Sequence, residues 1–287
     1  MSAVPGRALH YVFKIGDRAK NAFFFQTILG MKVYRHEEFK EGCDAECNGP
    51  YDNRWSKTMI GYGPESSNFV FELTYNYGVK SYELGNDFGG VTIHSKDILA
   101  TAAKHSYPVV KQGNHNILAS PDGYKFYVVE TTSPNPVQQV ALHVKDLAAS
   151  RKYWHELLKM NVIEEDEKSV LLTYGAEQTS LRLTLLKEPL NRAKAYGRIA
   201  FEIPEAAQKS LFETVKATPS GGSILKPLIK LDTPGKATVS VIILADPNGH
   251  EICFVDKEGF TELSQPDEAA GGQLEKYIRK DPFQEKK

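Results

Sequence analysis

ALHYVFKIGD, at residues 8–17, recurs further along the chain as QVALHVKD at residues 139–146. A run with apolar residues at helical spacing follows each copy, as NAFFFQTILGMKV and then as SRKYWHELLKMNV. The helix-like runs are offset by 129 residues, and the strand-like runs share that offset when His10 is aligned with Gln139. A constant offset across two different kinds of segment indicates an internal duplication.

Two weaker copies of the same pattern begin at Gly90 (GVTIHSKDILATAAKH) and Arg198 (RIAFEIPEAAQKSLFETV). In every copy an acidic residue stands where the helix begins, and its carboxylate can accept the free amide hydrogens of the first turn. These residues are Asp17, Asp97, Asp146 and Glu205. Short strand candidates follow each helix. The chain therefore predicts an α+β fold of four βαβββ modules, at residues 8–79, 86–131, 138–187 and 196–256.

The length of 287 residues suits two domains better than one. Pairing the modules in chain order predicts a first domain at residues 1–133 and a second at residues 134–256. The charged, Gly- and Pro-punctuated tail at 257–287 is expected to form a helix or two packed loosely on the outside, or to be partly disordered.

The formal charge of -1 provides no general field for nucleic acid or an anionic membrane, so a small-molecule substrate is expected. No apolar run approaches the roughly 20 residues that span a bilayer, and the N-terminus has no secretory signal. We therefore expect a cytoplasmic protein, monomer or homodimer. Import into mitochondria through an uncleaved signal stays open.

The chain contains three cysteines, Cys43, Cys47 and Cys253. An odd and sparse count argues against a disulfide scaffold. Cys43 and Cys47 lie in a polar Gly/Pro-containing segment, and a single CxxxC is weak evidence for a metal site. We interpret this pair as loop composition.

The segment FVFELTYNYG, residues 69–78, places a carboxylate in the middle of an aromatic strand. Alternation puts Phe71 on one face, and Glu72 and Asn76 on the other. The same rule puts His10 and Lys14 on one face of the first strand. If these strands are neighbours, the four polar side chains converge on a cavity.

Four βαβββ modules whose first strand starts with His or Gln, seven residues before an Asp, resemble the vicinal oxygen chelate superfamily, which includes glyoxalase I. Within it, ELTYNYG, WSKTMIGYGP and LDTPGKATVSVIILADPNGHEICFV are similar to the glyoxalase domain-containing protein 4 group. The resemblance covers about residues 8–256. It implies paired modules that curl into half-barrels around a divalent metal.

The ligand positions that the resemblance implies are only partly filled. They fall on His10 and Glu72, Gly90 and Tyr127, Gln139 and Arg182, and Arg198 and Cys253. If module one pairs with module two, the site offers His10 and Glu72 with a phenol. If it pairs with module four, His10, Glu72 and Cys253 form a predicted zinc set, with Arg198 nearby.

The resemblance also assigns roles beyond the metal. Lys14 and Asn76 match positions that contact glutathione in glyoxalase I, whereas Asn86 replaces a glutathione-binding arginine. Glu72 is the predicted catalytic carboxylate as well as a metal ligand.

The implied function is that of a glyoxalase I-like lyase of the lactoylglutathione lyase type, which removes methylglyoxal or a related dicarbonyl. It would isomerise a thiohemiacetal with zinc or nickel and with glutathione as co-substrate. The alternative is a binding or regulatory module that kept the cavity and lost the chemistry. Four residues at ligand positions favour that alternative: Gly90, Tyr127, Arg182 and Arg198.

Overall fold

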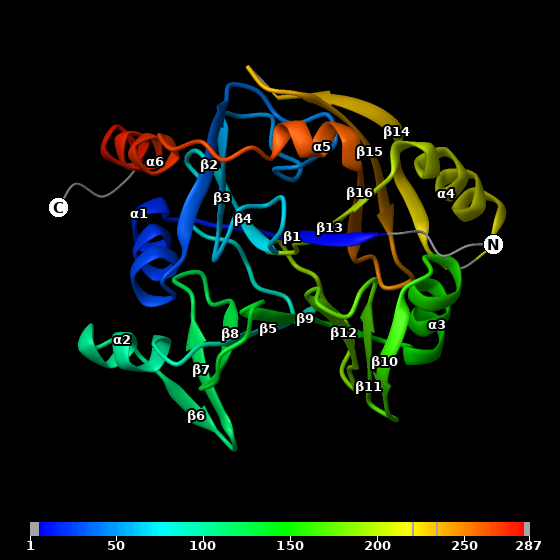
Figure 1. The fold of residues 1–287 in the computed structure, drawn as a ribbon, viewed down its shortest axis with the longest axis horizontal. Helices are drawn as coiled ribbons and strands as arrows, with labels where there is room; N and C mark the ends of the chain where they lie inside the picture. Colours follow the sequence, from blue (N-terminus) through cyan, green and yellow to red (C-terminus); the bar gives the residue numbers. More distant parts are fainter. Residues whose placement is uncertain (1–5, 220, 234, 284–287) are drawn as a thin grey trace.

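The computed structural model describes residues 6–219, 221–233 and 235–283, which form two eight-stranded sheets with few helices (Figure 1). This confirms the predicted α+β class. The first module comprises β1 (Arg7–Lys14), α1 (Arg18–Ala22), η1 (Phe23–Ile28), β2 (Lys32–Phe39), β3 (Trp55–Gly61) and β4 (Val70–Asn76). The second comprises β5 (Phe88–His94), α2 (Ile98–Lys104), β6 (Val110–Gln112), β7 (His115–Ala119) and β8 (Lys125–Val129).

The other two modules repeat this order. The third comprises β9 (Val137–Val144), α3 (Leu147–Arg151), η2 (Lys152–Leu157), β10 (Asn161–Glu165), β11 (Ser169–Thr173) and β12 (Ser180–Leu185). The fourth comprises β13 (Arg198–Ile203), α4 (Glu205–Ala217), β14 (Ser223–Asp232), β15 (Thr238–Ala245) and β16 (Glu251–Asp256). Two helices follow, α5 (Lys257–Leu263) and α6 (Ala270–Arg279).

The modules do not pair in chain order. The first sheet, ordered β14-β15-β16-β13-β1-β4-β3-β2, combines modules four and one. The second sheet, ordered β10-β11-β12-β9-β5-β8-β7-β6, combines modules three and two. The predicted division at residues 1–133 and 134–256 assumed that neighbours pair throughout, and the sheets correct it. Antiparallel contacts of β1 with β13 and of β5 with β9 join the modules instead.

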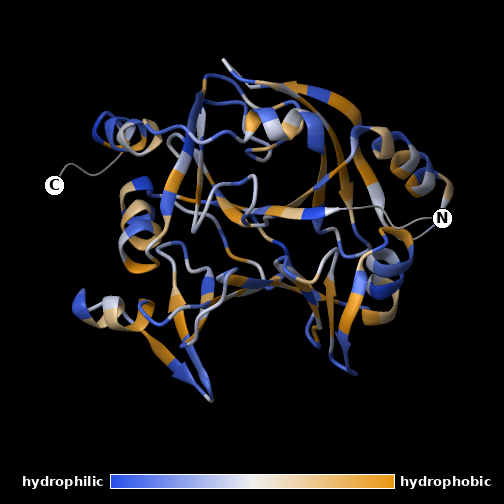
Figure 2. Cartoon of the chain, viewed as in Figure 1, coloured by the Kyte–Doolittle hydropathy of each residue, from blue (hydrophilic) through white to orange (hydrophobic). Residues whose placement is uncertain are grey.

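The core lies between the two sheets because most strands bury one apolar face of their alternating pattern there. Phe13 of β1 contacts Tyr124 at a ring-centroid distance of 4.5 Å and Phe126 of the second sheet at 5.8 Å. Phe71 and Leu73 belong to the same buried cluster, as the alternation of β4 predicts. Figure 2 shows hydrophobic and hydrophilic residues alternating along both the strands and the helices, and mostly hydrophilic residues in the loops. The opposite face of the first sheet carries polar side chains together with a smaller apolar cluster that includes Val239, Val241 and Phe260.

The predicted helix caps are half right. The Asp17 carboxylate accepts a hydrogen bond from Lys20 N at 3.0 Å, and Asp146 accepts one from Ala149 N at 2.9 Å. Asp97 precedes α2 but makes no capping hydrogen bond, and Glu205 lies inside α4, after Pro204. The two working caps belong to the two stronger copies of the repeat.

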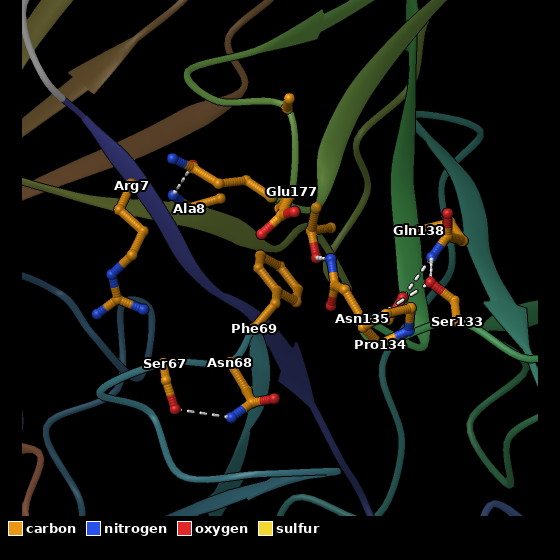
Figure 3. A pocket seen from close by; sticks show the side chains of 13 residues that line it. Arg7, Ala8, Ser67, Asn68, Phe69, Ser133, Pro134, Asn135, Gln138 and Glu177 are labelled. Atoms are coloured by element: carbon orange, nitrogen blue, oxygen red, sulfur yellow. Dashed lines mark hydrogen bonds between the residues drawn. The ribbon is translucent and has the colours of Figure 1, made fainter.

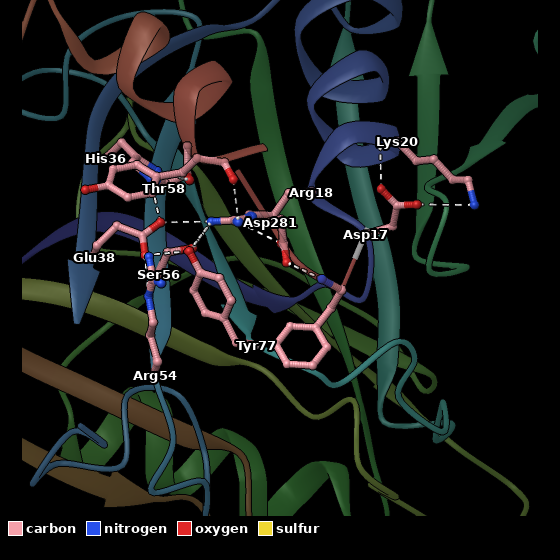
Figure 4. Close-up of polar contacts among 12 residues, drawn as sticks. Asp17, Arg18, Lys20, His36, Glu38, Arg54, Ser56, Thr58, Tyr77 and Asp281 are labelled. Carbon is pink, nitrogen blue, oxygen red and sulfur yellow. Dashed lines mark hydrogen bonds and ion pairs between the residues drawn. The ribbon is translucent and has the colours of Figure 1, made fainter. Parts of the chain in front are cut away.

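The tail packs firmly, which corrects the prediction of a loose one for its described part, up to residue 283. Phe260 and Leu263 of α5 are buried. The Arg18 guanidinium donates to Asp281 Oδ2 at 2.7 Å and to the Tyr277 carbonyl at 3.0 Å (Figure 4). Arg18 also donates to Glu38 at 2.9 Å, so the tail is fixed to module one. The two ends of the chain, residues 1–5 and 284–287, lie outside the described residues.

Within the described ranges, no helix combines the length and apolar character needed to cross a bilayer.

Candidate active site

A cavity of about 90 Å³ lies on the face of the first sheet opposite the core. We call it the inner cavity. Its polar lining comes from six strands and consists of His10, Arg35, Lys57, Glu72, Arg198 and Cys253. Apolar side chains of β14, β15 and α5 complete the wall. The cavity therefore collects the ligand positions of modules one and four.

Strand register explains which polar residues meet. Val12 of β1 pairs with Glu72 of β4 on one side and with Arg198 of β13 on the other. His10, two residues earlier on the same face, pairs with Ala200, which in turn pairs with Cys253. Cys253 is thus two strands from His10, about 10 Å at the usual strand spacing.

His10 and Glu72 face each other, as the sequence predicts. His10 Nε2 lies 3.7 Å from Glu72 Oε2, and Thr74 Oγ1 donates to Glu72 Oε1 at 3.1 Å. Burial, followed by the positive charge of Lys57, lowers the pKa of His10 to about 3, so the imidazole is neutral. Burial also raises the pKa of Glu72 above its usual value. His10 Nδ1 is buried without a hydrogen-bond partner among the described residues.

Three cationic side chains line the same cavity. The Arg35 guanidinium binds Glu65 through two hydrogen bonds of 2.9 and 3.0 Å. Arg198 donates to Glu251 Oε2 from Nε at 2.9 Å and from Nη2 at 2.7 Å. Lys57 Nζ is more loosely held, 3.8 Å from Glu37 Oε2. Lys57 is consequently the cavity cation whose charge is least balanced by a carboxylate.

The two ends of the first sheet approach each other over the cavity. Lys236, in the turn between β14 and β15, reaches Glu37 of β2 with an Nζ to Oε1 distance of 3.5 Å. Helix α5 covers the gap with Phe260 and Leu263. The sheet is therefore closed into a half-barrel with a lid.

A short loop forms another part of this lid. Cys43 and Cys47 are joined in a disulfide, which the interpretation as loop composition missed. Arg198 Nη1 donates to the Ala45 carbonyl at 2.9 Å, so the loop is tied to β13. Cys47 lines the inner cavity. A disulfide across four residues adjusts one loop and is no scaffold, which is why the cysteine count did not reveal it.

The residues present do not fit a divalent metal. Within the described ranges, no group of three or more His, Cys, Asp or Glu side chains is placed to hold one. Burial raises the pKa of Cys253 to about 12, whereas a thiolate is the form that binds metal. Lys57 and Arg198 would also repel a cation at short range. The predicted set of His10, Glu72 and Cys253 shares a cavity but is not assembled as a ligand group.

Lys14 and Asn76, the predicted glutathione contacts, are buried and occupied within the protein. Lys14 Nζ donates to the Tyr196 carbonyl at 2.5 Å and lies 3.6 Å from the centre of the Tyr196 ring. Asn76 exchanges hydrogen bonds with Asn48 and donates to the Tyr82 hydroxyl at 2.9 Å. Neither lines the inner cavity. Lys14 and Asn76 therefore contact other residues of the protein and do not face the inner cavity.

A second hollow, of about 360 Å³, adjoins the inner cavity. We call it the outer hollow. Five residues line both spaces: Cys47, Lys57, Leu231, Val239 and Leu263. Lys230 and Glu41 add polar groups to the outer hollow alone. A molecule too large for the inner cavity could extend into it past Lys57.

The corresponding positions of the second sheet form a different site. The Arg182 guanidinium donates to Gln139 Oε1 at 3.0 Å and pairs with the exposed Glu164 at 3.3 Å. Gln139 donates to Thr92 at 3.1 Å. Gly90 has no side chain, and Tyr127 lies across it. This face has satisfied polar groups and no carboxylate at a ligand position.

Another hollow, of about 380 Å³, lies away from these positions, between the ends of the two sheets (Figure 3). Its side chains bond to their own neighbours: Gln178 accepts from Ala8 N at 3.0 Å, and Gln138 donates to Ser133 at 2.9 Å. Figure 3 shows no acid and base directed at a common point. We do not regard it as a reaction site.

Known proteins place the chain in one family. Residues 146–263 match the family model described as glyoxalase domain-containing protein 4-like, C-terminal domain. The rat glyoxalase domain-containing protein 4 is 49% identical over 269 residues, covering 92% of this chain and 90% of the relative. The chain belongs to the glyoxalase domain-containing protein 4 family.

The glyoxalase character extends beyond that family name. A Caenorhabditis elegans protein named glyoxalase 1 is 45% identical over 279 residues, covering 97% of this chain and 98% of the relative. The crystal structure of glyoxalase I from Zea mays superposes with a TM-score of 0.70 at 25% identity, covering 97% of each chain. The predicted resemblance to glyoxalase is thereby confirmed, and the protein is glyoxalase-like in sequence and in fold.

Sequence reasoning found His10 and Glu72 but missed Arg35 and Lys57. Both lie on outer strands of module one, in KVYRHEEF and WSKTMIG, where a charged residue is usually exposed. The alternation that places Lys57 on the face of Glu72 was available in the sequence. The curvature of the sheet, which turns this face toward the inner cavity, could not be predicted from the sequence.

Proposed function

We propose that this protein is a lyase of the lactoylglutathione lyase type, acting in the inner cavity on the adduct of a thiol and a small 2-oxoaldehyde such as methylglyoxal. The observation that carries the proposal is the buried Glu72 carboxyl group 3.7 Å from His10. A carboxyl whose pKa is raised by burial is a suitable base near neutral pH. The name of the nematode relative, glyoxalase 1, supports the same reaction class.

The reaction is an isomerisation that needs a base and a stabilised anion. Glu72 would take the proton from the carbon that bears sulfur, and the electron pair would move toward the neighbouring carbonyl to give an enediolate. The protonated Glu72 would return the proton to the former carbonyl carbon, while the hydroxyl proton passes to the second oxygen. A thioester results, and no oxidant or reductant takes part.

The enediolate carries negative charge that the surrounding cations would stabilise. Lys57 is the most loosely held of the three, and Arg198 is fixed in position by Glu251. Donors placed in advance where charge develops contribute strongly in a cavity shielded from water. Because the residues do not fit a divalent metal, the proposed stabilisation of the enediolate comes from these cationic side chains alone.

Glutathione is the proposed thiol, and the outer hollow is the proposed place for its peptide part. The inner cavity of about 90 Å³ holds only a few non-hydrogen atoms, whereas the outer hollow is about 360 Å³. Lys57 lies at the junction of the two. The thiol would therefore reach the reacting carbons past Lys57.

A second candidate function is binding without turnover. The internal hydrogen bonds of Lys14 and Asn76 favour it, because they occupy the groups expected to hold glutathione. In that case the cavity would bind a small ligand and Glu72 would only position it.

Turnover separates the two functions. Thioester formation from methylglyoxal and glutathione is followed for the wild type, for Glu72→Gln and for Glu167→Gln, an exposed control with the same chemical change. We expect Glu72→Gln to reduce kcat by about 10²–10⁴-fold, the usual contribution of a general base. The control should keep the wild-type rate. A wild type without turnover, tested also with other thiols, would contradict the lyase assignment and favour binding alone.

A further inference from the structure

The charged side chains around the inner cavity are unbalanced. Among the described lining residues, Arg35, Lys57 and Arg198 are positive, and Glu72 is the one carboxyl group. They come from β2, β3 and β13, strands that are well separated along the first sheet. A cluster assembled from distant strands is a built feature of the cavity and not a local run of charge.

The carboxylates behind the cavity neutralise Arg35 and Arg198, through Glu65 and Glu251, more closely than they neutralise Lys57. Glu37 is shared by Arg35 at 3.0 Å, Lys236 at 3.5 Å and Lys57 at 3.8 Å. Arg35 is also bound by Glu65, so Lys57, the most distant of the three, is the cavity cation with the weakest counter-ion. Among the described residues, the 3.8 Å ion pair with Glu37 is the nearest polar contact of the Lys57 ammonium group. The Lys57 side chain is only 14% exposed. Its ammonium group is available to a ligand in the cavity.

His10 provides a second, independent sign of a missing partner. The His10 side chain lines the cavity, and its Nδ1 atom is buried without a hydrogen-bond partner among the described residues. A buried polar atom of this kind costs free energy unless a ligand or water satisfies it. With its proton on Nδ1, the neutral ring donates one hydrogen bond to an anion.

We infer that the inner cavity is an anion site that binds a short carboxylate, a 2-oxo or 2-hydroxy acid of about three carbons. The carboxylate lies against Lys57 and the positive field of Arg198, and the oxygen on carbon 2 lies between His10 and Glu72. The cavity has a volume of about 90 Å³, which suits a ligand of this size when the ligand does not extend into the outer hollow. The inference rests on the same cavity as the proposed function but does not require turnover.

This occupant explains the charges that a divalent metal leaves unexplained. A dication would face Lys57 and Arg198 with no third ligand beside His10 and Glu72 among the described residues. A short acid instead places its carboxylate on the loosely held ammonium group of Lys57 and its oxygen on carbon 2 beside the His10 ring. Charge-assisted hydrogen bonds of this kind are the stronger ones.

Calorimetric titration tests the inference with two matched ligands, D-lactate and propane-1,2-diol, at constant ionic strength. The two share a three-carbon skeleton and a hydroxyl on carbon 2, and only lactate is charged. We expect one saturable lactate site per chain and at least tenfold weaker binding of the diol. Equal binding of the two, or no binding of lactate, would overturn the anion site.

Two variants locate the site. Lys57→Gln should weaken lactate binding at least tenfold, and Lys57→Arg should restore most of it, which loss of folding could not produce. Lys125→Gln, which removes an exposed lysine of β8, should bind lactate as the wild type does. Unchanged binding by Lys57→Gln would place the acid elsewhere and contradict the inference.

Zinc is titrated in parallel, into protein freed of metal with a chelator. We expect no stoichiometric zinc site that depends on His10. A one-to-one zinc site abolished by His10→Ala would replace the anion site with a metal site. Protein that binds lactate without turnover refutes the proposed lyase alone, and protein that turns over without binding lactate refutes this inference alone.

Discussion

The two sheets are built from the same repeated module and use their outer faces in opposite ways. The first sheet joins its ends over a cavity, where Lys236 meets Glu37 and α5 forms a lid. The second sheet ends in β6, whose three residues are all exposed, and in the mostly exposed β10. Figure 1 shows these two edges turned away from each other. The two copies of the module therefore resemble each other on the sheet faces that form the core and differ on the outer faces.

Residues at matching positions of the two sheets differ according to whether the sheet is closed over a cavity. Glu72 in the closed sheet is buried beside His10, whereas its counterparts Tyr127 and Arg182 stand on an open face. A buried carboxyl or cation has a strong effect on a ligand because water does not screen it. The difference teaches that closing the sheet, more than the βαβββ module itself, makes a chemically useful site here.

The sharpest way to break this contrast is to remove one arginine from each sheet. Arg18 lies under the tail with Glu38 and Asp281, and its side chain is 1% exposed (Figure 4). Arg18→Met leaves the buried Asp281 carboxylate without its cation, whereas Glu38 keeps Arg54, so we expect the free energy of unfolding to fall by about 3–5 kcal/mol. Arg182→Met, in an exposed pair, should lower it by no more than about 1 kcal/mol. Denaturant unfolding measures both, and equal losses would contradict the contrast.

A smaller effect concerns pH. The pKa of His10 is about 3 in the folded protein and near 6.5 when unfolded, so the unfolded chain takes up the proton first. As pH falls from about 6.5 to about 3, His10 should therefore lower the free energy of unfolding by up to about 1.4 kcal/mol per pH unit. Glu72, whose pKa is raised, acts in the opposite direction.

The comparison that isolates His10 is His10→Asn against His94→Asn in the second sheet. The first variant should flatten the acid-side dependence of the unfolding free energy, and the second should retain the wild-type slope. Unfolding curves at half-unit pH intervals give the slopes. Identical slopes in the wild type and His10→Asn would show that the ring is not held neutral by burial.

Much of the fold follows from local patterns. Alternation in FVFELTYNYG predicts the buried face of Phe71 and the polar face of Glu72, because side-chain direction in a strand is a local property. The module boundaries follow from the repeat for the same reason. Asp17 and Asp146 cap their helices as expected.

What the sequence did not determine depends on contacts between distant segments. Module pairing is decided by β1 against β13 and β5 against β9, and two pairings had equal support in the strand patterns. The packing of the tail depends on Arg18. In the sequence Arg18 looks like a surface residue of a helix, and only the fold brings Asp281 next to it. Lys57 became a cavity residue only through the curvature of the sheet.

A crystal structure of the protein grown with D-lactate tests most directly whether the closed first sheet, and not the open second one, is the functional half. We predict electron density for one acid in the inner cavity, with its carboxylate on Lys57 and its hydroxyl between His10 and Glu72. The face of the second sheet around Gln139 and Arg182 should carry none. Lactate bound at Arg182, with the inner cavity containing only water, would contradict the account.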